Sequence, residues 1–216
     1  MKRILIITLA AAALVANCTQ ETEDNSALAL AALAIAAPNC TVNGTQFYAD
    51  GTVDCSSGTS AVATGTAFLA AAQTHGDVLS LQVTVDVGSG SEDKVEILGH
   101  GSGRAATSAA FIRLTNTGNT RAGGASNSSG GDTGINQNGD GTYCIEFHNE
   151  AEVHAIYDKL ACPAGTKATT STHWDSEGNN GSAVTTGAPA GKNWGFSLVN
   201  SGISGLTVNS EEKFTD

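Results

Sequence analysis

Apolar and polar residues alternate along much of the chain from residue 40 onward, and this two-residue period is typical of β-strands that bury one face. In the clearest segment, 78–87, five aliphatic residues alternate with polar ones: Leu79, Leu81, Val83, Val85 and Val87. The pattern predicts further strands over 41–48, 64–70, 94–99, 109–115, 142–148, 153–160, 192–199 and 203–209. We therefore expect an all-β fold, an antiparallel two-sheet β-sandwich of jelly-roll or lectin-like architecture.

Two long polar segments interrupt this pattern. Residues 116–141 are almost all Asn, Thr, Gly, Ser, Asp and Ala, and residues 164–191 have a similar composition. Loops of this length are uncommon in a domain unless they carry function or lack order, so we look for binding there, and variable surface loops are the alternative. Trp174 lies in the second loop, where its indole could stack on a sugar or anchor a partner; partial burial is the alternative. Trp194 alternates with Phe196 and Leu198, which assigns it to the core.

The N-terminal segment follows a different pattern. Lys2 and Arg3 precede an apolar run, 4–16, that contains one polar residue, Thr8. This is the organisation of a secretory signal peptide, and the run is too short to span a bilayer. An acidic stretch (19–26) and an Ala/Leu-rich stretch (27–37) of high helix propensity follow. We expect a signal peptide over 1–17, a tether with a short N-terminal helix over 18–39, and one sandwich domain over 40–216.

The segment Leu14-Val15-Ala16-Asn17-Cys18 resembles the lipobox of bacterial lipoproteins, in which the cysteine becomes the lipidated first residue of the mature chain. Asn17 departs from the usual Gly, Ala or Ser, and the box is similar in this to the looser boxes of spirochaete lipoproteins. The resemblance implies lipidation of Cys18 and anchoring to the bacterial outer membrane or cell surface. Ordinary cleavage after Ala16, which would give a soluble secreted protein, is the alternative.

The cysteine count bears on this choice. Five cysteines in an exported chain leave one without an intramolecular partner, and lipidation of Cys18 would account for it. For the remaining four we expect the sequential disulfides Cys40–Cys55 and Cys144–Cys162, although three connectivities are possible. The chain contains no C-x-x-C motif, so we expect these cysteines to be structural.

The charge balance limits the partners. The formal net charge is −11, and loss of Lys2 and Arg3 with the signal peptide would lower it to −13. A surface this acidic argues against nucleic acid and against electrostatic attachment to anionic lipid. No later segment has the length of a membrane span, so we expect the lipid to be the membrane anchor.

One predicted hairpin carries several chemically active side chains. Alternation over 142–148 assigns three side chains to the core: Tyr143, Ile145 and Phe147. Glu146 and His148 then share the opposite, solvent-facing side, and a turn at 150–152 would place His148 across from His154. Two imidazoles beside carboxylates could hold a divalent metal such as zinc; a solvated polar face is the alternative.

A second candidate metal site precedes this hairpin. Asn136, Asn138 and Asp140, followed by Gly141, resemble the start of an acidic calcium loop, in which oxygen ligands alternate and the sixth position is Gly. The twelfth position is Phe147, where a calcium loop has Glu, and the same residue types are common in tight turns. We therefore assign no cofactor, and calcium at this loop is the alternative.

We assign no catalytic residue. Residues 99–103, Gly-His-Gly-Ser-Gly, fit neither a nucleotide loop nor a nucleophile elbow, and we expect a flexible turn. The strand carboxylates Asp86, Glu96, Glu146 and Asp158 lack the spacing typical of sandwich hydrolases. The sequence therefore favours a noncatalytic binding role with a protein, matrix or carbohydrate partner. A glycosidase-like hydrolase and a metal-binding module are the alternatives.

Overall fold

The computed structural model describes residues 37–101, 110–117, 120–124, 127–132, 139–149, 153–165, 167, 174–175 and 191–214. The chain divides into two compact units, Met1–Ala37 and Pro38–Asp216, and nearly all described residues belong to the second. The predicted signal peptide, Cys18 and most of the Ala/Leu-rich segment lie outside the described residues and stay predictions. Within the described part, no helix is long and apolar enough to cross a membrane.

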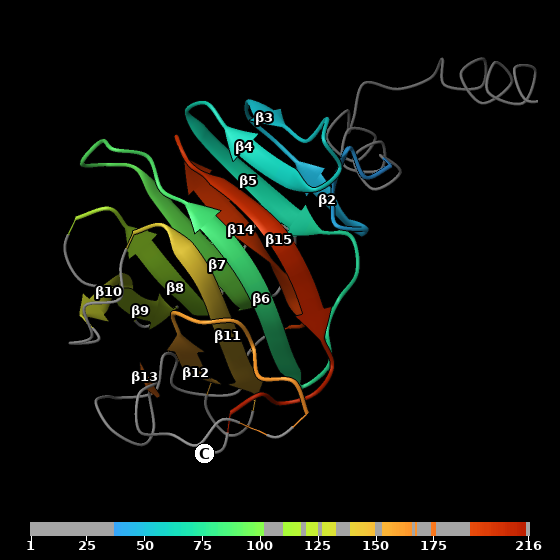
Figure 1. Ribbon diagram of the computed structural model, residues 1–216, viewed down its shortest axis with the longest axis vertical. Helices are drawn as coiled ribbons and strands as arrows, with labels where there is room; N and C mark the ends of the chain where they lie inside the picture. Colours follow the sequence, from blue (N-terminus) through green and yellow to red (C-terminus); the bar gives the residue numbers. More distant parts are fainter. Residues whose placement is uncertain are drawn as a thin grey trace, which may run out of the picture. The chain divides into compact units, whose positions relative to one another are not determined.

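The unit Pro38–Asp216 consists of two antiparallel sheets (Figure 1). The strand order of the first sheet is β1 (Cys40–Val42), β2 (Thr45–Ala49), β5 (Thr66–Ala71), β14 (Asn193–Val199), β7 (Lys94–Gly101), β8 (Ala110–Thr115), β9 (Arg121–Gly124), β10 (Asn127–Asp132). That of the second sheet is β13 (Trp174–Asp175), β12 (Val153–Asp158), β11 (Gly141–Asn149), β6 (Val78–Asp86), β15 (Gly202–Asn209), β4 (Ser60–Ala63), β3 (Val53–Asp54). The predicted all-β, two-sheet class is confirmed.

A single large hydrophobic cluster takes side chains from both sheets. The second sheet contributes the alternating aliphatic residues of β6 and the three residues of β11 that were assigned to the core; all are buried. The first sheet contributes fully buried residues from several strands: Phe47, Leu69, Ile97, Ile112 and Phe196. Burial of each such side chain contributes about 1.5–3 kcal/mol to the free energy of folding. Burial of the apolar faces is therefore the main interaction that holds the two sheets together.

The strand predicted over 41–48 is a hairpin of two strands, β1 and β2. Val42 pairs with Thr45, which leaves Asn43 and Gly44 as a two-residue loop. Their φ angles are 47° and 82°. Positive φ at both positions is the geometry of a type I′ turn, which Asn-Gly adopts more readily than other residue pairs.

Part of the polar segment 116–141, expected to be a loop, is strand. β9 pairs with β8, and β10 pairs with β9 at the edge of the first sheet. Gly, Ser and Asn are poor strand formers, so the composition concealed these strands, which main-chain hydrogen bonds join to the sheet. Two further short strands, β3 and β4, were also not predicted; they form one edge of the second sheet.

Both predicted disulfides are present. Cys40 and Cys55 lie 15 residues apart in sequence with a Cα–Cα distance of 5.4 Å; for Cys144 and Cys162 the values are 18 residues and 4.7 Å. The first bond joins β1, at the edge of the first sheet, to the residue that follows β3 at the edge of the second. The first bond therefore links the two sheets along one edge. In the chain-entropy model, a disulfide that closes a loop of this length stabilises the fold by about 3 kcal/mol.

Candidate functional site

A cavity of about 500 Å³ opens at one end of the sandwich, where β5 and β15 end and β2, β6 and β14 begin. We call it the Trp194 cavity. Its walls combine an indole, an imidazole, amides, a hydroxyl and a carboxylate, from Trp194, His75, Gln46, Gln73, Thr45 and Asp77. The segment between β5 and β6 supplies His75, Gln73 and Asp77.

Trp194 is held in one orientation. Its ring meets Phe47 and Phe196 edge-on, with centroid distances of 5.6 and 6.0 Å. Its Nε1 donates a hydrogen bond to the main-chain carbonyl of Gln73 at 3.1 Å. The residue is 4% exposed, so its assignment to the core is right, and it also lines the cavity. Because its N–H is already satisfied, the small part of the indole that remains exposed is apolar.

Two histidines meet behind the cavity wall. The rings of His75 and His100 are 4.4 Å apart between centroids and nearly perpendicular, at 78°. His100 has a φ of 55°, a left-handed conformation that costs a non-glycine residue about 1–2 kcal/mol. The flexible turn expected at Gly-His-Gly is wrong for residues 99–101, because they are buried and continue β7. Gly99 has no room for a side chain, since an added Cβ would lie 2.8 Å from the ring of Phe147.

Both of these imidazoles favour the neutral form. Burial, reinforced by the neighbouring His100, lowers the pKa of His75 to about 4. Burial also lowers the pKa of His100, whose Nε2 lies 3.3 Å from the carbonyl oxygen of Phe147. Neither ring nitrogen of His75 has a hydrogen-bond partner in the described part of the chain. Both nitrogens are also buried from solvent, so His75 lines the cavity without presenting an accessible donor or acceptor to it.

The one carboxylate in the cavity wall is balanced by a cation. Asp77 forms an ion pair of 3.0 Å with Lys192, and the hydrogen bond and charge of Lys192 lower the pKa of Asp77. The main-chain N–H of His75 donates to the carbonyl of Lys192 at 3.1 Å, which ties the segment before β6 to the residue before β14. Sequence reasoning missed His75, Gln73 and Asp77; the available signal was a short polar stretch, Gln-Thr-His-Gly-Asp, between two apolar strands.

Of the five predicted metal residues, the structure describes the side chains of two, Asp140 and His148. Asp140 Oδ1 accepts a hydrogen bond from the main-chain N–H of Val87 at 2.8 Å. His148 pairs with His154 as predicted, but the side chain of His154 lies outside the described residues. His148 follows Asp140 by eight positions along an extended chain, about 26 Å at the rise of a strand, so these two residues cannot ligate one ion.

The remaining predicted ligands, Asn136 and Asn138, lie outside the described residues. Within the part that the structure describes, no three His, Cys, Asp or Glu side chains are grouped so that they could hold a metal ion. Trp174 has its main chain in β13, paired with Tyr157, while its side chain is not described. The calcium, zinc and Trp174 sites stay predictions.

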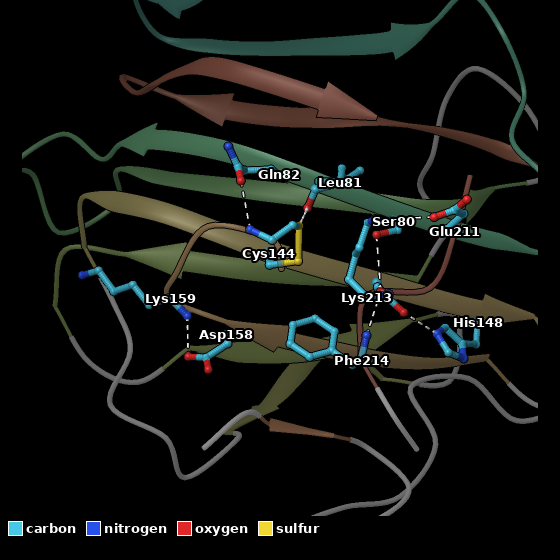
Figure 2. Close-up of a disulfide and its surroundings, with 12 residues drawn as sticks. Ser80, Leu81, Gln82, Cys144, His148, Asp158, Lys159, Glu211, Lys213 and Phe214 are labelled. Carbon is cyan, nitrogen blue, oxygen red and sulfur yellow. Dashed lines mark hydrogen bonds and ion pairs between the residues drawn. A yellow bond between two sulfur atoms is a disulfide. The ribbon is translucent and has the colours of Figure 1, made fainter. Parts of the chain in front are cut away.

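The expectation that Glu146 and His148 face solvent is wrong. Their side chains are 0% and 2% exposed. The C-terminal segment 211–214, which we call the C-terminal clasp, crosses this side of β11 (Figure 2). Glu146 Oε1 accepts hydrogen bonds from the main-chain N–H groups of Lys213 and Phe214, and Oε2 lies 2.7 Å from His148 Nε2. A covering segment more than sixty residues away leaves no trace in the alternation of β11.

The clasp encloses a second, smaller apolar cluster. Phe214 is fully buried and packs with Cys144, Ile156 and Cys162 on the side of the second sheet that faces away from the main core. The N–H of Cys162 donates to Gln82 Oε1 at 2.9 Å, which fixes the disulfide over β6 (Figure 2). The polar side chains beneath the clasp therefore have a structural role.

The strand carboxylates considered for hydrolysis are distributed over both sheets. Glu96 lies on β7 of the first sheet, while Asp86, Glu146 and Asp158 lie on the second. Glu146 is covered by the clasp, and Asp158 is 5% exposed and accepts a hydrogen bond from the N–H of Lys159. None of the four lines the Trp194 cavity, so the cavity offers no pair of them.

No protein-family model and no curated protein matches the chain. Among solved structures, it is similar to a carbohydrate-binding module, CBM66 from Bacillus subtilis (10% identity, TM-score 0.45), over 77% of this chain and 95% of that one. The cellulose-induced protein Cip1 matches at 11% identity and a TM-score of 0.40, over 84% of this chain and 92% of Cip1. A sialidase matches at 12% identity and a TM-score of 0.34, over 67% of this chain and 15% of the sialidase chain. The function that each of these names states is that of the compared protein.

Proposed function

We propose that this protein is a noncatalytic binding module that takes a carbohydrate in the Trp194 cavity. The observation that carries the proposal is the pairing of a fixed, buried indole with uncharged hydrogen-bonding groups in one wall. A sugar ring has an apolar C–H face and hydroxyl groups that both donate and accept. An aromatic surface surrounded by amides and hydroxyls matches both parts.

The size and charge of the cavity support the same ligand class. A volume of about 500 Å³ lies within the range of small-molecule sites. Asp77 is paired with Lys192, and His75 is neutral above its pKa of about 4, so the lining presents little net charge. Such a lining favours a neutral polyhydroxylated ligand over a free ion, because an unpaired charge in the ligand would lose hydration without a counter-charge.

We further propose that a lipid on Cys18 anchors the protein to the outer membrane or cell surface. The lipobox-like segment 14–18 and the odd cysteine count support this assignment. The acidic stretch 19–26 would then act as a spacer between lipid and sandwich. Mass spectrometry of the protein from its native host tests the anchor: a diacylglycerol-sized adduct on Cys18 is expected, and an unmodified Asn17 at the N-terminus contradicts it.

Glycan binding is tested on an array of neutral and acidic oligosaccharides, followed by calorimetric titration with any glycan that binds. Gln73→Ala removes an exposed amide but keeps the main-chain carbonyl that holds Trp194, and we expect affinity to fall about tenfold, the value of one hydrogen bond of about 1.4 kcal/mol. The matched control is Asn116→Ala, which removes an exposed amide that is not part of the cavity. Equal loss in both variants, or no glycan bound by the folded protein, contradicts the proposal.

A further inference from the structure

One side of the Trp194 cavity is a short segment without strand structure, residues 72–77 between β5 and β6, which we call the wall segment. The structure describes all six of its residues. Gln73, Thr74 and Asp77 are exposed, and Gly76 has no side chain. Apart from a small alanine, His75 is therefore the side chain that packs the wall segment against the sandwich.

His75 packs on a second imidazole, and we call His75 and His100 the histidine pair. Their rings meet edge to face, at 4.4 Å between centroids, and His100 in β7 is 2% exposed. Neither ring nitrogen of His75 nor Nδ1 of His100 has a hydrogen-bond partner in the described part of the chain, and all three are shielded from solvent. Two neutral rings can pack in this way, whereas a protonated ring would hold a charge without hydration and without a partner.

The groups that face His75 do not compensate for such a charge. Burial and the neighbouring His100 lower the pKa of His75 to about 4, and the ammonium group of Lys192 acts in the same direction. The main-chain carbonyl of Gly76 and the carboxylate of Asp77 act in the opposite direction without cancelling these effects. The closed wall segment therefore excludes a proton that the same imidazole would accept in water.

His100 is in a similar environment, with groups from two further elements around it. Burial lowers the pKa of His100, and His148 of β11, which pairs with a carboxylate, acts in the same direction. The main-chain carbonyls of Phe147 and Gly191 and the charge of Asp77 act in the opposite direction. The histidine pair as a whole therefore binds a proton more readily after its rings separate and reach water.

The other contacts of the wall segment do not respond to acid in the same range. The hydrogen bond and charge of Lys192 lower the pKa of Asp77 from its ordinary value of 3.8, so this ion pair persists from pH 6.5 down to about pH 4. The remaining contacts are hydrogen bonds of the main chain, to β2, to Lys192 and to the indole of Trp194, and they carry no titrating group. Within this range the histidine pair is therefore the acid-sensitive contact.

We propose that the histidine pair makes the Trp194 cavity sensitive to pH, because uptake of one proton by the pair separates the wall segment from β7. The proton adds to the lone pair of a ring nitrogen, which solvent reaches only when the two rings part. The wall segment carries the main-chain carbonyl of Gln73 that fixes Trp194, so its release removes one side of the cavity. That carbohydrate binding is then lost in acid rests on the proposed function.

Release of the wall segment is measured without any sugar, by hydrogen exchange and mass spectrometry of the purified full chain at about pH 7 and about pH 4.5, after correction for the intrinsic effect of pH. Since the pKa of His75 rises from about 4 toward its ordinary 6.5 on release, we expect protection of residues 72–77 to fall about tenfold, a value discounted for partial exposure. Amides of β6 and β14 should keep their protection.

Two variants remove one titrating ring each. His75→Gln and His100→Asn should both reduce the tenfold ratio to less than about twofold, and Asn tolerates the left-handed conformation of residue 100. The matched control is Lys192→Gln, which removes the ion pair with Asp77 and leaves both imidazoles in place. It should lower protection by a similar factor at both pH values, so that the ratio stays near tenfold.

The proposal is wrong if the ratio in the parent is near one, or if it is equal in the parent and in His75→Gln. It is also wrong if acid first exposes the clasp amides 211–214, because the proton would then act at His148. An array of neutral oligosaccharides read at both pH values tests the consequence for binding: signals should fall at about pH 4.5 in the parent and persist in His75→Gln. A tenfold exchange ratio with no glycan bound at either pH contradicts the proposed function alone, whereas glycan signals that do not change with pH overturn the control of binding.

Discussion

The C-terminal clasp should be a major contributor to the stability of the second sheet, and Phe214→Ala tests this. The substitution removes a fully buried ring that packs on Cys144 and Ile156. It also weakens the hydrogen bonds that the main-chain N–H groups of Lys213 and Phe214 donate to the Glu146 carboxylate. Both effects act on the same side of β11, so we expect the substitution to lower the stability of the whole second sheet.

The size of the effect follows from the burial. Truncation of a fully buried Phe to Ala in a core costs about 3–5 kcal/mol. The clasp lies near the end of the described chain and can relax around the gap, so we expect about 3 kcal/mol, at the lower end of that range. For a domain of this size each 1 kcal/mol lowers the unfolding midpoint by about 2–4 °C, and the midpoint should therefore fall by about 6–12 °C.

Urea unfolding followed by tryptophan fluorescence measures the change in free energy. Hydrogen exchange read by mass spectrometry then shows whether the amides of 211–214 and of β11 lose protection together. The control is Val208→Ala, an apolar truncation in β15 at a side chain that is 40% exposed, which should cost less than about 0.5 kcal/mol. A Phe214→Ala variant as stable as this control, or clasp amides that exchange freely in the parent protein, would refute the reasoning.

Three further outcomes are expected. Unfolded His75 binds a proton below about pH 6.5, but folded His75 binds one only near pH 4, so the free energy of unfolding should fall as the pH drops through this window. His75→Gln should reduce that fall by about 1–2 kcal/mol, a value discounted for partial exposure of the ring and measured by urea titration. Gly195→Ala places a Cβ 2.0 Å from a main-chain oxygen of β5 and should cost at least about 1–3 kcal/mol, whereas Gly76→Ala, with no atom nearer than 4.0 Å, should be nearly neutral; equal midpoints contradict this. Replacing Cys144 and Cys162 by Ser should cost about 3 kcal/mol, and an unchanged midpoint in non-reducing buffer would be inconsistent with the bond.

The features that could be predicted from sequence are those set by local alternation. Leu79 through Val85 on β6 were assigned to the core because every second residue is aliphatic, and a strand with one buried face requires this pattern. The disulfide pairing is also a local feature, because cysteines that are close in sequence pair at little loop-closure cost.

The features that were missed depend on main-chain geometry or on distant segments. Asn43-Gly44 carries a recognisable hairpin signal, but the segment 41–48 that contains it was interpreted as one strand. β9 and β10 are built from Gly, Ser and Asn, so their pairing rests on main-chain hydrogen bonds that composition does not reveal. The left-handed conformation of His100, which brings it beside His75, has no sequence signal beyond its two flanking glycines.

The outer face of the second sheet and the end of the sandwich that holds the Trp194 cavity differ in a way that bears on function. On the second sheet, the clasp occupies the Glu146 carboxylate with two main-chain N–H groups and covers β11 with Phe214, so a ligand could reach these polar groups only after the clasp opened. At one end of the sandwich, the Trp194 cavity instead has exposed polar side chains, among them Gln73 and Asp77, in walls that both sheets provide. A buried polar group that is fully hydrogen-bonded stabilises a fold, whereas an accessible or unpartnered one favours a ligand. Within the described structure, the hydrogen bonds beneath the clasp therefore indicate a structural role for the outer face of the second sheet, and the accessible polar groups of the Trp194 cavity support the binding role proposed for it.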